Sequence, residues 1–136
     1  MFNRKPEEEI LSITNEYGAG FIAFSPLAQG VLTDKYLNGI PEDSRAAKPT
    51  GFLRKEQVSP LLVEKVKQLN VIASERGQTM AEMALAWALR DPRVTSVIVG
   101  TRNMDQLKDN LNALQNLNFT KEELIRIDTI LDGATL

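Results

Sequence analysis

A short run of residues that follows an apolar segment has the composition of an anion-binding site. Residues 97–99 are predicted to form a buried strand, Gly100 ends it, and Asn103 caps the helix that follows. A strand that leads through glycine into a helix start presents unpaired amides and the positive end of the helix dipole. Arg102 adds a planar guanidinium, which suits bidentate contact with a phosphate. Residues 95–111 are therefore a candidate phosphate site, although the chain holds neither the G-x-G-x-x-G nor the G-x-x-x-x-G-K-[ST] fingerprint.

Residue types that carry acid–base, thiol or metal chemistry are scarce in this chain. The 136 residues include no histidine and no cysteine, which removes the commonest general base, the commonest zinc ligand, thiol catalysis and disulfides. Glu7, Glu8 and Glu9 could supply carboxylates to a metal, but a solvated helix start explains them more simply. Any catalysis by this chain alone would have to use lysine, tyrosine or carboxylates, and we assign no metal-ligating residue. The lack of cysteine fits a cytoplasmic protein.

The composition limits the size of the fold and its partners. With 43% hydrophobic and 25% charged residues, the chain has the make-up of one globular domain. A net charge of −2 gives no electrostatic reason to expect nucleic acid or an acidic membrane surface as partner. No apolar run approaches the roughly 20 residues that span a membrane, and the first residues are polar and unlike a signal peptide.

The order of the predicted elements indicates an α/β fold. Short apolar strands are predicted at 20–24, which stops at Pro26, and at 97–99. Capping residues and prolines predict helices that begin at Pro6, Pro60, Met80, Met104 and Lys121. Strands that alternate with helices favour parallel pairing, and a parallel pair is normally part of a larger sheet. Residues 37–57 have no clear period and form a long loop, of a length typical of lids and binding loops.

Apolar residues at helical spacing define the faces that are expected to pack inward. They are Ile10, Leu11 and Thr14 in the first helix, Leu62, Val66, Leu69 and Ala73 in the second, Leu107, Leu111 and Leu114 in the fourth, and Leu124, Ile127, Ile130 and Leu131 in the last. The helix at 80–90 is apolar nearly all round and should be deeply packed, with Trp87 in the core rather than stacked on a cofactor.

Two segments of the chain together resemble a known enzyme family. Residues 20–36, GFIAFSPLAQGVLTDKY, resemble the seventh strand and following loop of aldo-keto reductases. Residues 97–110, VIVGTRNMDQLKDN, resemble the eighth strand and helix of the same barrel, and residues 41–45 and 80–90 also fit. The pattern is most similar to the branch that holds bacterial glyceraldehyde-3-phosphate reductases and the β subunits of voltage-gated potassium channels.

The resemblance implies a helix-rich, C-terminal fragment of a (β/α)₈ TIM barrel. Residues 1–136 would form a single partial domain with the seventh and eighth strands and without the first six. Members of the family use NADP(H) to reduce aldehydes and ketones by hydride transfer, through an Asp, a Tyr, a Lys and a His from earlier strands. Because Tyr17, Tyr36 and the lysines do not occupy those positions, we expect the isolated chain to reduce no carbonyl substrate. A small carbonyl substrate is expected only for the full-length parent.

The same resemblance assigns cofactor-binding roles to residues of both segments. It places Phe24 against the nicotinamide ring, Gly100 and Arg102 near the 2′-phosphate, and positive charge from Lys35 and Arg45 over the cofactor. The pyrophosphate would lie on Ser25, Pro26, Leu27, Ala28, Gln29 and Gly30, and the adenosine part on Gln106, Asp109 and Asn110. Binding of NADP(H) by this chain alone is expected to be weak, since a nicotinamide needs contacts from both sides and one side is missing.

Structural explanations compete with several of these roles. Asn103 and Gln106 have the spacing of a helix cap, which forms without a ligand. Pro26 could simply end a strand, and Phe24 taken alone is more often a core residue. Lys35 and Arg45, taken singly, are ordinary surface charges. The joint pattern across both segments is what favours a cofactor site.

Two hypotheses from different classes follow for the function. In the first, the chain is the C-terminal, NADP(H)-binding part of an aldo-keto reductase. In the second, it is a folded remnant without catalysis that serves as a nucleotide-binding or self-association module. In either case two strands cannot close a barrel, so unpaired strand edges and exposed apolar faces predict a homo-oligomer. The loop at 37–57 is expected to be disordered or rearranged without the rest of a barrel.

Overall fold

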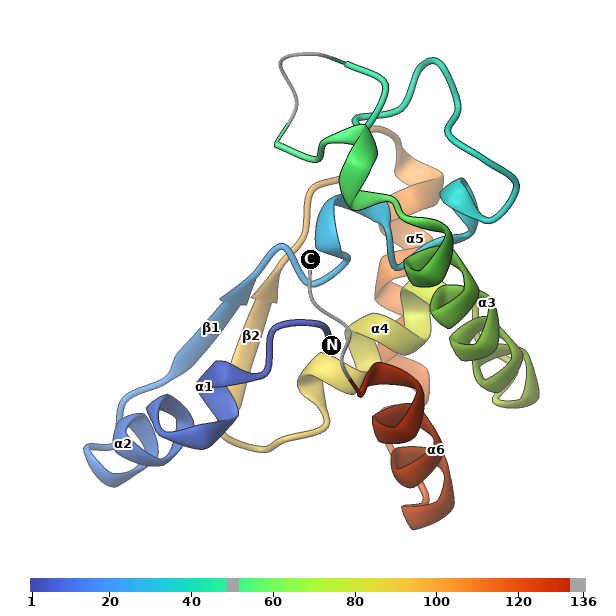
Figure 1. The fold of residues 1–136 in the computed structure, drawn as a ribbon. Helices are drawn as coiled ribbons and strands as arrows, with labels where there is room; N and C mark the ends of the chain where they lie inside the picture. Colours follow the sequence, from blue (N-terminus) through green and yellow to red (C-terminus); the bar gives the residue numbers. More distant parts are fainter. Residues whose placement is uncertain (49–51, 133–136) are drawn as a thin grey trace.

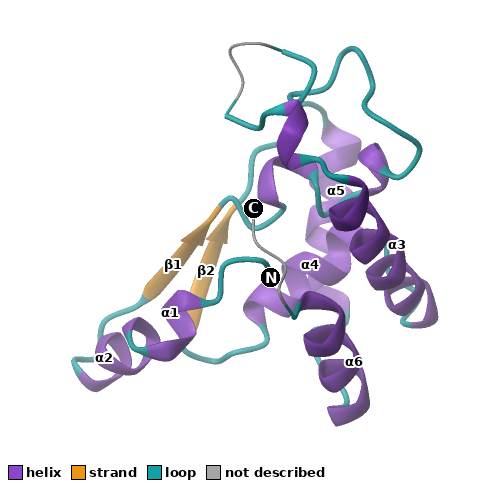
Figure 2. Cartoon of the chain, viewed as in Figure 1, coloured by secondary structure: helices purple, strands orange, loops and turns teal. Residues whose placement is uncertain are grey.

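A computed structural model describes residues 1–48 and 52–132, and helices dominate this part of the chain (Figure 2). The α-helices are α1 (Lys5–Glu8), α2 (Ile10–Glu16), α3 (Pro60–Glu75), α4 (Met80–Leu89), α5 (Met104–Asn112) and α6 (Lys121–Leu131), and the strands are β1 (Phe21–Phe24) and β2 (Val94–Ile98). Short 3-10 turns lie at Ala28–Gly30, Asp34–Tyr36, Lys55–Gln57 and Ala113–Gln115.

The two strands pair in parallel, as the alternation of strands and helices predicts. Their carboxyl ends point toward the same end of the molecule, where the chain continues into the long loop (Figure 1). Helices α3, α4, α5 and α6 form a body to one side of the sheet, and α1 and α2 lie near the amino ends of the strands (Figure 1). This arrangement is consistent with part of a (β/α)₈ barrel, of which the described residues contain two strands.

A β-bulge at the start of the sheet depends on a glycine. The pairing register shifts between Phe21 and Ile22, where Thr95 of β2 is left out of the ladder. The Thr95 hydroxyl instead accepts a hydrogen bond from the Phe21 amide at 3.1 Å. A Cβ on Gly20 would lie 2.8 Å from Thr95 Oγ1, so any larger residue would push the strands apart here.

One face of this sheet is uncovered, which corrects the prediction of a buried strand at 97–99. The strand covers Val94–Ile98 instead, and it is only half-buried. Ile22, Phe24 and Ile98 share the uncovered face and are 58%, 81% and 61% exposed. A parallel strand is buried on both sides only when helices or other strands cover both faces, and the described residues cover one. Phe24 is therefore not the core residue that its type alone favours.

The hydrophobic core lies among α3, α4 and α6 and includes the turn after β1. The predicted inward stripe of α3 is confirmed, since Leu62, Val66, Leu69 and Ala73 are all buried. Helix α4 is buried nearly all round, as predicted, and Trp87 belongs to the core. In α6, Ile127 and Leu131 are buried and Leu124 and Ile130 pack against the core at its edge. By contrast, Leu111 on α5 and Leu114 in the 3-10 turn that follows are exposed and Leu107 is half-buried, which corrects the inward stripe predicted for this helix.

Helix starts form where the sequence places capping residues. The Thr79 and Thr120 hydroxyls each accept a hydrogen bond from the amide three residues on, at 3.1 Å. Glu82 and Glu123 return the contact to the capping amides at 2.7 Å. Ser59 caps α3 through the Leu62 amide, at 3.2 Å. These reciprocal bonds satisfy amides that the first turn of a helix leaves without partners, so each start is fixed locally.

The N-terminal helix differs from the prediction because it is broken at Glu9. Glu9 has φ −133° and ψ −49°, which separates α1 from α2 and changes the face that α2 buries. Leu11 is buried as predicted, whereas Ile10 is exposed and Thr14 is only half-buried. The Glu7 carboxylate in α1 accepts hydrogen bonds from the side chains of Arg4 and Arg90. A single straight helix would have to keep these bonds and bury Leu11 at the same time.

Both arginines, Arg4 and Arg90, lie against the ring of Trp87. The Arg90 guanidinium lies 3.5 Å from the centre of the Trp87 ring, and that of Arg4 lies at 5.3 Å. Glu7 pairs with Arg4 at 2.7 Å and with Arg90 at 3.3 Å. Burial acts to raise the pKa of Glu7, but the hydrogen bonds and charges of the two arginines outweigh it and leave this pKa below its usual value. This engagement favours a structural role for Glu7 over metal binding.

The side chain of Arg76 ties the end of α3 to the connection between α5 and α6. It is 3% exposed, and its guanidinium lies 3.7 Å from the centre of the Phe119 ring. It donates hydrogen bonds to Gln78 Oε1 (2.8 Å), Glu123 Oε2 (2.8 Å), the Asn118 carbonyl (3.0 Å) and the Asn116 carbonyl (3.1 Å). This buried cation, together with the hydrogen bond from Gln78 Nε2 to the Asn116 carbonyl at 3.1 Å, holds a segment without α-helix or strand.

The long loop at 37–57 is largely a series of turns, with one 3-10 turn at Lys55–Gln57. Ser44, Ala46 and Leu53 are buried, so the described parts of this loop pack against the body rather than extending into solvent. Residues 49–51 lie outside the described residues, and so does Gly133, which the sequence places near the end of the last helix.

The described ranges contain no helix that combines the length and hydropathy of a membrane span. They also contain no group of three or more acidic, histidine or cysteine side chains that could hold a metal ion.

The turn from α4 into β2 is expected to make stability pH-dependent at acidic pH. Asp91 accepts hydrogen bonds from the Arg93 side chain at 2.9 and 2.6 Å, and these chiefly lower its pKa to about 2. A lowered folded-state pKa stabilises the fold above the unfolded value, and this contribution is lost as the pH falls through about 2. Because the pair is partly exposed, we expect Asp91→Asn to cost about 1 kcal/mol in the free energy of unfolding near neutral pH, and this cost shrinks to a small fraction as the pH falls to about 2. Urea titrations of both proteins across this range measure the difference, and a pH-independent gap would contradict the assignment.

Candidate functional site

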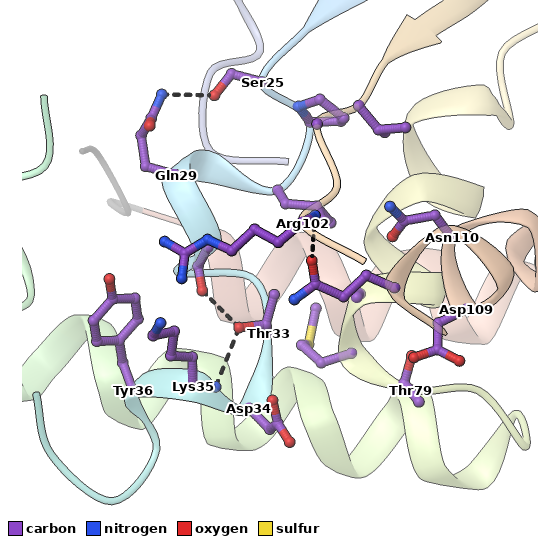
Figure 3. A pocket seen from close by; sticks show the side chains of 18 of the residues that line it. Ser25, Gln29, Thr33, Asp34, Lys35, Tyr36, Thr79, Arg102, Asp109 and Asn110 are labelled. Carbon is purple, nitrogen blue, oxygen red and sulfur yellow. Dashed lines mark hydrogen bonds between the residues drawn. The ribbon is translucent and has the colours of Figure 1, made fainter. Parts of the chain in front are cut away.

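A cavity of about 890 Å³ lies at the carboxyl ends of the two strands. It is bounded by the turns after β1, the start of α4 and the start of α5 (Figure 3). The structure brings together twelve of the fourteen residues to which the sequence assigns a cofactor role. They are Ser25, Pro26, Leu27, Gln29, Gly30, Lys35, Arg45, Gly100, Arg102, Gln106, Asp109 and Asn110. Phe24 and Ala28 do not line the cavity, and Phe24 lies on the uncovered face of the sheet.

The turn after β1 has an unusual backbone. Ser25, Ala28 and Gln29 have φ values of 54°, 48° and 60°, in the left-handed region that side chains other than glycine rarely adopt. Pro26 stops the strand at this point because it has no amide to donate to a ladder. Such strain persists only where surrounding contacts over-determine it, and it is concentrated at binding sites. The backbone geometry of this turn, like its sequence, therefore indicates a functional role.

Side-chain hydrogen bonds hold this turn and the loop against each other. Gln29 Nε2 donates to Ser25 Oγ at 3.0 Å, and Gln29 Oε1 accepts from Arg45 at 2.6 Å. The Thr33 hydroxyl donates to the Gly30 carbonyl at 2.7 Å and accepts from the Lys35 amide at 3.1 Å. These bonds fix one wall of the cavity without any bound molecule.

The charge of Lys35 is only loosely compensated. Its Nζ lies 3.8 Å from Asp43 Oδ2, beyond hydrogen-bond distance, and Asp43 is largely exposed. An ion pair at this distance costs little to break, so the Lys35 ammonium is available to a ligand in the cavity.

The opposite wall is formed by the end of β2 and the first turns of α5. The Arg102 amide donates to Gln106 Oε1 at 2.9 Å, and the Gln106 amide donates to Asn103 Oδ1 at 2.9 Å. The capping role of Asn103 and Gln106 is thus real, and it occupies the Gln106 oxygen. Within residues 1–48 and 52–132, the Arg102 guanidinium has no hydrogen bond or ion pair, and it extends across the cavity toward the side of Lys35 and Tyr36 (Figure 3).

Sequence reasoning missed the contribution of the junction between α3 and α4. Asn70, Ser74, Gln78, Thr79, Met80 and Ala81 line the cavity there, together with Thr33, Asp34, Tyr36, Asp43, Ile98 and Val99 elsewhere. The capping box at Thr79 predicts a helix start at this point, but its closeness to the other walls is a tertiary property. For Asp34 and Tyr36, the sequence offered one signal of a place in the site: both flank Lys35.

The electrostatic character of the cavity is mixed rather than uniformly positive. Lys35, Arg45 and Arg102 line it together with the carboxylates of Asp34, Asp43 and Asp109. A site of this kind suits a ligand that carries both anionic groups and hydrogen-bond donors, as a nucleotide carries phosphates beside hydroxyl and amino groups.

Residues 1–132 match the Aldo/keto reductase family. The chain belongs to this family. Its sequence is 48% identical over 128 residues to L-glyceraldehyde 3-phosphate reductase of Escherichia coli O157:H7, a match that covers 91% of this chain and 37% of that protein. It is 35% identical over 134 residues to a putative voltage-gated potassium channel subunit beta of Schizosaccharomyces pombe, covering 96% of this chain and 39% of the other.

A probable voltage-gated potassium channel subunit beta of Oryza sativa subsp. japonica is 39% identical over 137 residues, which cover 98% of this chain and 42% of that protein. The chain therefore spans about two fifths of the length of these relatives. The resemblance to the reductase and channel-subunit branch is confirmed.

Proposed function

We propose that the cavity binds the phosphate and adenosine parts of NADP(H), as the cofactor-binding share of an aldo-keto reductase. The observation that carries this proposal is the convergence of two segments, separated by more than sixty residues in the sequence, on one cavity. The resemblance assigns a cofactor role to each segment, and Arg102 from one segment lines the same cavity as Lys35 and Arg45 from the other. Cations from both segments suit the 2′-phosphate and the pyrophosphate of one cofactor.

The residues present fit the cofactor group by group. The guanidinium of Arg102, which has no partner among the described residues, suits the 2′-phosphate, which distinguishes NADP(H) from NAD(H). The turn at 25–30, with Lys35 and Arg45 beside it, suits the pyrophosphate. Asp109 and Asn110 offer an acceptor and an amide to the adenosine part, while Gln106 keeps its NH₂ group available. When bound, NADPH supplies a hydride to a carbonyl carbon.

The substrate of the complete protein is proposed from the relatives. Two of them, both from Escherichia coli, are named for L-glyceraldehyde 3-phosphate, so we propose a small phosphorylated aldehyde. The chain contains no histidine, and none of its tyrosines or lysines matches the tetrad positions. We therefore expect the 136-residue chain to reduce no carbonyl by itself and to bind the cofactor weakly, and Phe24 would contact the nicotinamide only in the complete protein.

A calorimetric titration of the 136-residue chain with NADPH and with NADH tests the cofactor assignment. NADPH is expected to bind more tightly, and Arg102→Ala is expected to weaken NADPH binding by about tenfold or more, because it removes a charge-assisted contact. The same substitution should leave NADH binding nearly unchanged. Arg54→Ala, an exposed arginine that does not line the cavity, is the matched control. Equal affinity for the two nucleotides in the unsubstituted chain would contradict the proposal.

A further inference from the structure

The Gln29 side chain connects two residues of the cavity wall, the hydroxyl of Ser25 and the guanidinium of Arg45. Its side-chain amide donates to Ser25 Oγ at 3.0 Å and accepts from the Arg45 guanidinium at 2.6 Å. Figure 3 shows the Gln29 side chain directed at Ser25 along a hydrogen bond. An amide is suited to this place because it can donate on one side and accept on the other.

Gln29 also determines where the Arg45 side chain points. Ser44 and Ala46, on either side of Arg45, are buried, so they anchor the backbone and turn the arginine side chain outward. Within the described ranges, the contact with Gln29 is the one hydrogen bond of the Arg45 guanidinium, and it has no ion pair there. Without Gln29 this long side chain would sample many rotamers above the cavity.

The backbone conformation of Gln29 indicates that its side chain has a role in the cavity wall. The residue has φ 60°, a conformation that glycine or asparagine adopts at lower cost. Glutamine at this position keeps the left-handed conformation while its side chain makes two hydrogen bonds across the site. Strained residues held by their own contacts are typical of binding turns.

We propose that Gln29 is a positioning residue that holds Arg45 and Ser25 ready for the pyrophosphate of NADP(H). The proposal rests on the function proposed above. A guanidinium has five N–H donors, and the contact with Gln29 engages one nitrogen and leaves donors for phosphate oxygens. Because glutamine is neutral, it orients Arg45 without cancelling its charge. Ordering the arginine before the ligand arrives lowers the entropic cost of binding.

A double-mutant cycle on Gln29 and Arg45 tests this role, with NADPH binding by the 136-residue chain as the readout. Gln29→Met keeps the length of the side chain and removes both hydrogen bonds. It is expected to weaken NADPH binding about three- to tenfold in the wild-type background and less than about twofold in the Arg45→Ala background. Gln68→Met on the exposed surface of α3 is the matched control and should change nothing.

Gln29→Glu separates positioning from structural support. Glutamate keeps a partner for Arg45 and neutralises its charge, so it is expected to weaken NADPH binding at least as much as Gln29→Met while the thermal midpoint is not lowered. Wild-type affinity in Gln29→Met, equal losses in both backgrounds of the cycle, or wild-type affinity in Gln29→Glu would overturn this inference alone. A wild-type chain that binds no NADPH would overturn the proposed function, and this inference with it.

Discussion

Arg76→Ala is expected to lower the free energy of unfolding by about 3 kcal/mol, because it removes a buried cation that four acceptors surround. The substitution leaves the Asn116 and Asn118 carbonyls and the Glu123 carboxylate without this donor. Loss of the contact with the Phe119 ring adds to the effect. The connection between α5 and α6 has few other anchors, so the lesion should loosen α6 from α3.

A matched arginine allows this prediction to be measured against its control. Arg126 pairs with Glu75 at 2.6 Å, but the two side chains are 47% and 52% exposed. Arg126→Ala is therefore expected to cost less than about 1 kcal/mol. Urea denaturation followed by circular dichroism gives both values under the same conditions. Similar losses in the two variants would show that the buried contacts of Arg76 do not govern stability.

Self-association through the uncovered face of the sheet is the second large effect that we propose. This face, Ile22, Phe24, Ser96 and Ile98, carries no charged side chain, so the same face of a second copy is complementary to it. Within the described residues, the outer edges of β1 and β2 also have no strand partner. An isolated two-stranded sheet is marginal in water, which favours its completion by another chain.

Light scattering of the chain at roughly 50 μM is expected to give a dimer or a larger assembly, and Phe24→Lys is expected to shift it to the monomer. A lysine in the middle of an apolar contact would bury a charge without a partner. Phe52→Lys is the control, since Phe52 is exposed and lies outside the sheet. A monodisperse monomer in the unsubstituted chain would sink the proposal.

Helix starts could be predicted from this sequence because they are decided by neighbours in the chain. Ser59, Thr79 and Thr120 each cap the helix that follows, and the bonds involved span three residues. The same holds for the parallel pairing, which follows from the alternation of strands and helices. Local chemistry was sufficient for these features.

Burial could not be predicted as well, because it depends on what lies across from a residue. The apolar run at 97–99 has the composition of a buried strand, yet Ile98 faces solvent because nothing described covers that side. Ile10 is exposed because the helix breaks at Glu9, and that break accompanies contacts of Glu7 with Arg4 and Arg90. The contact with Arg4 is local, three residues away, whereas the contact with Arg90 spans 83 residues and has no signal in the local sequence.

Two walls of the candidate site, those at Ser25 and at Arg102, could be predicted from the sequence. The third wall, at the junction of α3 and α4, could not. Residues near Ser25 and Arg102 belong to recognisable motifs, so their convergence on one cavity could be expected. The junction at Gln78 and Thr79 has only the pattern of a helix start, and its place on the cavity arises from the packing of α3 against α4. The link from Gln29 to Arg45 spans sixteen residues and is visible only in three dimensions.

The arginines that enclose Trp87 have a consequence for spectroscopy. Trp87 is the one tryptophan of the chain, and it does not line the cavity. Its indole meets Arg4, which precedes α1, and Arg90, which follows α4. Intrinsic fluorescence of this protein thus reports the docking of the first residues onto α4. Because Trp87 is also part of the core, an emission change on heating reports loss of this docking together with opening of the core, and nucleotide occupancy has to be followed by another signal.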